Sequence, residues 1–172
     1  DEVRKVLEDI KRDLDRLAKR VKDVLREIEE LTKEAARTVK KVIEESRRLL
    51  RKLKEANLEE KDLRRALEES KKKSKEAKEK LDKIDRDIER KIRKLKEELE
   101  RLLRELEKRI RTINGRREDL TELLKRIEEK IKRLVEELER LLKRSREESK
   151  RLVEEMEKVN REIEEEIKKR AT

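Results

Sequence analysis

The chain has 172 residues, of which 57 are Lys or Arg and 47 are Asp or Glu, so its formal net charge is +10. It contains no His, Cys, Pro, Phe, Tyr or Trp, and Gly115 is its single glycine. Without His and Cys, the usual Ser-His and Cys-His catalytic constellations are excluded, and the redox compartment cannot be read from cysteine usage. Apolar residues never occur more than two in a row, which excludes a transmembrane span and the apolar region of a signal peptide.

The first predicted helix covers about residues 2–56. Asp1 and Glu2 place negative charge at its start, where such charge favours a helix N-terminus. Its apolar residues recur every 18 positions, in Val3, Val21 and Val39, in Val6, Val24 and Val42, and in Leu7, Leu25 and Ile43. The tripeptide Ala56-Asn57-Leu58 follows, and because asparagine tolerates the left-handed conformation that ends helices, we expect a helix C-cap there.

The second predicted helix covers about residues 59–113 and the third about 117–171. Glu60 follows Asn57 by three residues, which is the spacing of an N-terminal capping pair. The 18-residue interval continues in Leu63, Leu81 and Leu99, in Ala66, Ile84 and Leu102, in Ala77, Leu95 and Ile113, in Leu120, Leu138 and Met156, and in Leu123, Leu141 and Val159. Asn114-Gly115 separates the two helices and predicts a second C-cap with a short connection.

The 18-residue interval determines the expected architecture. Eighteen residues over five turns equal 3.6 residues per turn, the value for a straight α-helix, so each apolar stripe stays on one face without supercoiling. Short connections make neighbouring helices antiparallel. We therefore predict an all-α fold: a long, nearly straight, up-down-up antiparallel three-helix bundle, about 80 Å long, that forms one domain over residues 1–172. Disorder is the alternative for so charged a chain, but mixed charge signs and strict periodicity argue against it.

The polar faces carry a second pattern, in which glutamate precedes lysine or arginine by four residues. It occurs at Glu69 and Lys73, Glu76 and Lys80, Glu97 and Arg101, Glu136 and Arg140, and Glu164 and Lys168. Such pairs add about 0.2–0.5 kcal/mol each to a helix and specify no partner.

A few polar residues interrupt the apolar register. Ser70 and Ser74 take the positions of Ile88 and Ile92, Ser145 and Ser149 those of Ile127 and Ile131, Ser46 that of Ile10 and Ile28, and Thr32 that of Leu14 and Leu50. When the helices are folded back on one another, Ser46, Ser70 and Asn160 fall at one height, and Thr32 falls between the heights of Ser145 and Ser149. The register therefore predicts polar layers at core or core-edge positions.

Three interpretations of these hydroxyl groups are open. Each can bond the carbonyl one turn back in its own helix. They can instead bond across helices and fix register and topology. Small residues in place of Leu or Ile, near Ala35, Ala36, Ala66 and Ala77, can also leave a ligand pocket. In each case we expect apolar replacements of Ser46, Ser70 and Asn160 to keep the fold without lowering its stability.

Sites for catalysis, metals and cofactors are not predicted. Ser70 and Lys73 match the S-x-x-K spacing of some serine acyl-transfer enzymes, but the companion S-D-N and K-T-G motifs are missing and lysine is abundant. The carboxylates lie on solvated faces and lack the Glu-x-x-His pairs of di-metal bundles. A glycine-rich phosphate loop is impossible with one glycine. We therefore assign no catalytic, cofactor-binding or metal-binding residues.

The candidate for nucleic-acid binding is the run KKKSKEAKEK at residues 71–80, which holds six lysines. Such a run can give non-specific, salt-sensitive affinity for phosphates. It also contains two glutamates, and the chain has no aromatic residue on which bases could stack. The more economical interpretation is a solvated helix face.

In its combination of features the chain resembles computationally designed, parametrically generated bundles of the untwisted antiparallel three-helix kind. The shared features are the 18-residue repeat, the Glu-to-Lys pairs, the minimal connections at Asn57 and Asn114-Gly115, and the missing residue types. The resemblance implies a monomeric, hyperstable scaffold without natural function, enzyme activity, cofactor or partner, produced in the cytoplasm of an expression host. The alternatives are a natural spacer or interaction module of spectrin-like shape, and a non-specific basic nucleic-acid-binding rod.

Overall fold

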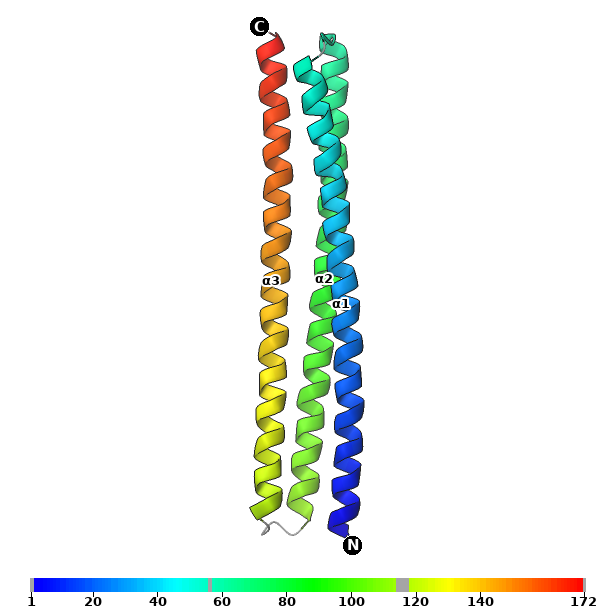
Figure 1. Ribbon diagram of the computed structural model, residues 1–172, viewed down its shortest axis with the longest axis vertical. Coiled ribbons are helices and arrows are strands. Elements are labelled where there is room, and N and C mark those ends of the chain that lie inside the picture. The colour runs from blue at the N-terminus through cyan, green and yellow to red at the C-terminus, as the bar shows by residue number, and fades with distance from the viewer. Residues whose placement is uncertain (1, 56, 114–117, 172) are drawn as a thin grey trace. The chain divides into compact units, whose positions relative to one another are not determined.

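The computed structural model describes residues 2–55, 57–113 and 118–171. Three α-helices make up nearly all of these residues: α1 (Glu2–Glu55), α2 (Glu60–Thr112) and α3 (Glu118–Ala171) (Figure 1). No strand occurs within these ranges. The helices pack against one another, so the predicted all-α three-helix bundle is confirmed.

The start of α2 differs from the predicted capping pair. The carbonyl oxygen of Glu59 accepts hydrogen bonds from the backbone amides of Asp62 (3.0 Å) and Leu63 (3.1 Å), which makes Glu59 the N-cap. Asn57 lies two residues earlier, in the non-helical connection, so it does not cap α2. The first turn, Glu60 to Leu63, places the acidic Glu60 and Asp62 at the helix N-terminus, where the helix dipole favours negative charge, and ends on the buried Leu63. Ala56 and the predicted break at Asn114-Gly115 lie outside the described residues.

The chain divides into two compact units, and each of the three helices contributes to both. The first unit comprises residues 1–29 and 88–143. Its ion pairs between α1 and α2 are Asp13 with Arg109 (2.8 Å), Arg20 with Glu98 (3.2 Å) and Glu27 with Lys91 (2.7 Å). As the residue number rises on α1, that of the partner on α2 falls. The two helices are therefore antiparallel in this unit.

The second unit comprises residues 30–87 and 144–172. Its interhelical ion pairs are Glu34 with Lys80 and Glu45 with Lys73 between α1 and α2, Lys71 with Glu164 and Lys78 with Glu157 between α2 and α3, and Arg47 with Glu155 between α1 and α3. The numbering runs in opposite directions for α1 against α2 and for α2 against α3. Both neighbouring pairs are thus antiparallel, which leaves α1 and α3 parallel.

The core follows the 18-residue repeat. Two rows of it, Leu63, Leu81 and Leu99 on α2 and Leu120, Leu138 and Met156 on α3, are at most 5% exposed throughout. One row on α1 behaves differently, because Leu7 and Leu25 are 37% and 38% exposed whereas Ile43 is buried. This row marks the edge of the apolar stripe, which neighbouring helices cover only in part.

The repeat makes a direct prediction about stability. We expect Leu99→Ala, which removes a fully buried side chain, to lower the free energy of unfolding by about 2–5 kcal/mol. Leu7→Ala, the matched change at the stripe edge, should cost about 1 kcal/mol or less. Guanidinium unfolding followed by circular dichroism measures both, and equal losses would contradict the assignment of core and edge.

Candidate functional site: two polar clusters in the core

Serine side chains occupy the bundle core. Among the described residues, the buried polar side chains are Ser46, Ser70, Ser74, Ser145 and Ser149. The apolar residues that hold the same register positions elsewhere, such as Ile28 and Ile88, are buried as well. The predicted core placement of the five serines is therefore confirmed.

Four of the polar residues form a cluster that joins all three helices: Ser46 of α1, Ser70 and Ser74 of α2, and Asn160 of α3. We call it the serine–asparagine cluster. Ser70 Oγ donates to Asn160 Oδ1 (2.9 Å), and Asn160 Nδ2 donates to Ser74 Oγ (2.8 Å). Ser46 Oγ lies 3.2 Å from Ser70 Oγ. Since the single proton of Ser70 goes to Asn160, Ser46 is the donor in this last contact.

The cluster decides between the first two interpretations of the core hydroxyls. Thr38, which is half-buried, and Thr112, which is exposed at the end of α2, donate to the carbonyl four residues back in their own helices. Ser46 and Ser70 bond across helices instead, and Asn160 lies at their height as predicted. Within the described residues, every buried side-chain nitrogen or oxygen has a hydrogen-bond partner. A buried polar group without one would cost about 1–3 kcal/mol, so complete pairing is what permits serine in this core.

A second polar contact joins α2 and α3 at Asp85. Ser149 Oγ donates to Asp85 Oδ1 (2.9 Å), and burial raises the pKa of Asp85, an effect that the hydrogen bond from Ser149 partly offsets. The sequence interpretation missed Asp85. Its signal was available, because Asp85 takes the register position that Leu67 and Leu103 hold 18 residues away. The predicted alignment of Thr32 with Ser145 and Ser149 stays a prediction.

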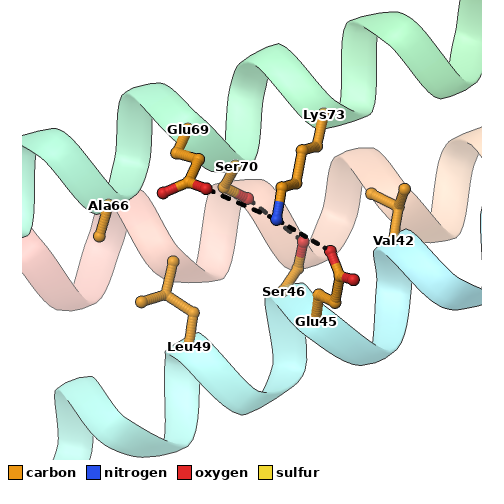
Figure 2. A pocket seen from close by; sticks show the side chains of 8 residues that line it. All are labelled: Val42, Glu45, Ser46, Leu49, Ala66, Glu69, Ser70 and Lys73. Atoms are coloured by element: carbon orange, nitrogen blue, oxygen red, sulfur yellow. Dashed lines mark hydrogen bonds and ion pairs between the residues drawn. The ribbon is translucent and has the colours of Figure 1, made fainter.

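A pocket of about 150 Å³ opens beside the serine–asparagine cluster, between α1 and α2 (Figure 2). It is lined by Val42, Glu45, Ser46 and Leu49 of α1 and by Ala66, Glu69, Ser70 and Lys73 of α2. A cavity is therefore present near Ala66 together with the interhelical hydrogen bonds, and ligand binding in it, the third interpretation, stays a prediction.

Lys73 does not meet the requirements of the S-x-x-K chemistry. Its Nζ lies 3.2 Å from Glu45 Oε2 and 3.5 Å from Glu69 Oε1, as Figure 2 shows. The hydrogen bond and charge of Glu45 raise the pKa of Lys73, so the amine stays protonated at neutral pH. A general base must be neutral to take a proton from serine, and Ser70 already gives its proton to Asn160. Ser70 and Lys73 therefore each contact other side chains of the bundle, Ser70 through its hydrogen bond to Asn160 and Lys73 through its ion pairs with Glu45 and Glu69.

The lysine run at residues 71–80 is also engaged within the chain. Lys71, Lys73, Lys78 and Lys80 each pair with a glutamate of α1 or α3. The hydrogen bond and charge of Lys71 lower the pKa of Glu164, as expected for a carboxylate that is stabilised in its ionised form. Phosphates would have to compete with these carboxylates. Two predicted i,i+4 pairs, Glu69 with Lys73 and Glu136 with Arg140, are also present.

Neither a metal cluster nor a membrane span emerges from residues 2–55, 57–113 and 118–171. Three or more His, Cys, Asp or Glu residues do not converge anywhere in these ranges in a way that could hold a metal ion. None of the helices is long and apolar enough to cross a membrane.

The serine–asparagine cluster predicts opposite effects for partial and complete replacement. Asn160→Leu leaves the Ser70 hydroxyl without its acceptor and Ser74 without its donor, so we expect a loss of about 1–3 kcal/mol in unfolding free energy. The quadruple change S46I/S70I/S74I/N160L installs apolar residues that the repeat already uses and should be at least as stable as the parent. Guanidinium midpoints give both values. A quadruple variant less stable than N160L would show that the cluster itself stabilises the fold.

Asp85 predicts a pH dependence of stability. Because burial raises its pKa above the ordinary value of 3.8, the unfolded chain ionises first, and stability falls as pH rises through the interval between the two values. Asp82 strengthens this shift and Arg146 opposes it. Asp85→Asn keeps an acceptor for Ser149 and should raise stability at pH 7 by on the order of 1 kcal/mol or less, since solvent still reaches the carboxylate.

The measurement is the melting temperature of both proteins between pH 2.5 and pH 7, in a fixed guanidinium concentration that brings the transition below about 90 °C. The advantage of D85N should vanish below the ordinary aspartate pKa. Asp23→Asn, the same change at an exposed residue of α1, is the control and should show no comparable gain. An equal gain in the control would assign the effect to net charge alone.

Comparison with known proteins gives a likeness to solved structures but not to a protein family. No protein-family model matches the chain. No curated protein matches it either. Among solved structures, the chain is similar to one described as "Computationally designed three helix bundle", with 21% sequence identity over 99% of this chain and 86% of that chain, and a TM-score of 0.45. The assignment of a three-helix bundle rests on the helices and interhelical contacts of the chain itself.

Proposed function

We propose that the chain is a de novo designed helical scaffold, monomeric and hyperstable, without natural biochemical function. The observation that carries the proposal is the use of the core polar groups. Ser46, Ser70, Ser74 and Asn160 bond to one another across three helices, and Ser149 bonds to Asp85. These groups use their hydrogen bonds to hold helices together, which is a structural role.

The regularity of the sequence supports a designed origin. Local helix preference, apolar register and surface charge all favour the same three-helix arrangement, with an 18-residue unit repeated in every helix. Agreement at every level is the criterion by which designed sequences specify a structure, and idealised helices of this kind are typically hyperstable. Surface ion pairs contribute little to that stability, since exposed pairs are worth about 0–1 kcal/mol each.

The absence of enzyme activity is part of the proposal. Catalysis at neutral pH needs a group that can exchange protons there, and the chain has no histidine or cysteine. Lys73 forms the S-x-x-K pattern with the core residue Ser70. Its hydrogen bond with Glu45 raises its pKa, which is the opposite of what a lysine base requires. Asp85 accepts a hydrogen bond from Ser149 of the neighbouring helix, so this carboxylate is used in an interhelical contact.

The alternatives are less well supported. A basic nucleic-acid-binding rod needs lysines available to phosphates, whereas Lys71, Lys73, Lys78 and Lys80 pair with glutamates. A natural spacer of spectrin-like shape would share the three-helix arrangement. The contacts of the described residues do not favour it over a scaffold.

The test is a combined measurement of stability and mass. We expect the helical circular dichroism signal to persist above 90 °C and the guanidinium midpoint to exceed about 5 M, which are the usual marks of hyperstability. Sedimentation equilibrium should give the mass of one chain, 21.1 kDa.

Three results would count against the scaffold. Cooperative unfolding near 50–60 °C, the range of ordinary domains, would contradict hyperstability. An obligate oligomer would contradict the monomer. Sequence-selective binding of DNA or RNA at physiological salt would favour the nucleic-acid alternative.

A further inference from the structure

The pocket between α1 and α2 has a simple origin in the sequence. Ser46, Ser70 and Ala66 line it, and the repeat places Ile28, Ile88 and Ile84 at the corresponding positions 18 residues away. Three branched side chains are thus replaced by three small ones around one point. The chain keeps its helices at this point and leaves about 150 Å³ unfilled.

The walls of the pocket combine apolar and polar groups in an ordered way. Val42, Leu49 and Ala66 supply aliphatic surface. Ser46 and Ser70, both buried, supply hydroxyl oxygens next to it. At the rim, Glu45 and Glu69 both pair with the ammonium group of Lys73, as Figure 2 shows, so the charges there are already engaged. A neutral ligand fits this environment better than an ion.

The direction of the hydrogen bonds selects the ligand further. Ser70 donates to Asn160, so Ser46 donates to Ser70. A serine oxygen has two lone pairs. Ser46 gives its proton to Ser70, and its oxygen can still accept a hydrogen bond. A ligand hydroxyl group can therefore donate to Ser46 Oγ without breaking the serine–asparagine cluster.

We propose that this pocket is a binding site for small neutral alcohols with a compact cyclic apolar body, with phenol as the defining example. The ring lies against Val42, Leu49 and Ala66, and the hydroxyl donates to Ser46. The size agrees, because an apolar protein cavity of about 150 Å³ accommodates a benzene ring. The inference goes beyond the scaffold role and does not depend on the designed origin or on hyperstability.

The affinity is limited by the few atoms of the ligand and by the open side of the pocket. We expect a dissociation constant on the order of 1–10 mM for phenol. Benzene, which lacks the hydroxyl group, should bind several-fold more weakly to the parent protein.

The experiment is a titration of the full chain with phenol, followed by amide chemical shifts in ¹⁵N-labelled protein. Saturable shifts should concentrate at residues 42–49 and 66–73. Ala66→Leu fills the pocket with the residue that the repeat carries at Leu102, and it should weaken phenol binding at least tenfold. Ala18→Leu, the same change at an exposed position of α1, should leave binding unchanged.

A second variant isolates the hydroxyl contact. Ser46→Ala removes the acceptor for the ligand while Ser70 keeps its own acceptor, Asn160. In this variant phenol should lose its advantage over benzene, whereas benzene binding should persist. Absence of saturable shifts at the pocket up to 20 mM phenol would overturn the proposal, and so would equal phenol affinity in A66L and A18L. Retention of the phenol advantage in S46A would overturn the assigned hydrogen bond.

Discussion

The structure depends on one constraint, the burial of a single apolar stripe on each helix. With 60% charged residues and 31% hydrophobic residues, the chain can form a core only from these stripes, so each stripe must face the neighbouring helices along its length. The 18-residue interval satisfies this requirement because it matches the 3.6-residue turn over five turns. Leu63, Leu81 and Leu99 show the result, since each is buried in the same way along α2.

The polar clusters are departures from this constraint, and their geometry explains why they are tolerated. A hydroxyl group in an apolar core is destabilising unless it is paired. Ser70 meets this condition by using its proton for Asn160 and accepting one from Ser46. The unfavourable consequence is incomplete packing beside the cluster, in the pocket where small residues replace isoleucines. Specific pairing and incomplete packing are thus two aspects of the same substitutions.

The sequence predicts the fold better than it predicts the local contacts. The helix number, the core rows and the height of Ser46, Ser70 and Asn160 follow from periodicity, which is a property of the backbone. The predicted cap of α2 at Asn57 is wrong, because Glu59 accepts the first helical hydrogen bonds and the acidic first turn begins after it, at Glu60.

The candidate site was predicted in part. Comparison of register positions identifies the serines, and the same comparison would have identified Asp85 opposite Ser149. The partner of each hydroxyl could not be deduced, because bonds to the own helix, as in Thr38, and bonds across helices are both compatible with the same spacing. The ion pairs of Lys73 could be predicted only in part. The pair with Glu69 follows from the helix spacing, whereas the pair with Glu45 depends on how closely α1 and α2 approach.

The repeat by itself permits more than one alignment of the helices, and the short connection between α1 and α2 and the polar contacts both select the observed one. A helix that slides by one 18-residue unit, about 27 Å, would bring equivalent apolar rows together again. If α2 slipped in this way, Ser46 would lie against Ile88 with its hydroxyl unpaired, and Asn160 would be separated from Ser70 and Ser74. The serine–asparagine cluster and the Ser149–Asp85 contact therefore add to the energy difference between the observed alignment and its shifted copies, which already lose apolar contact at the helix ends.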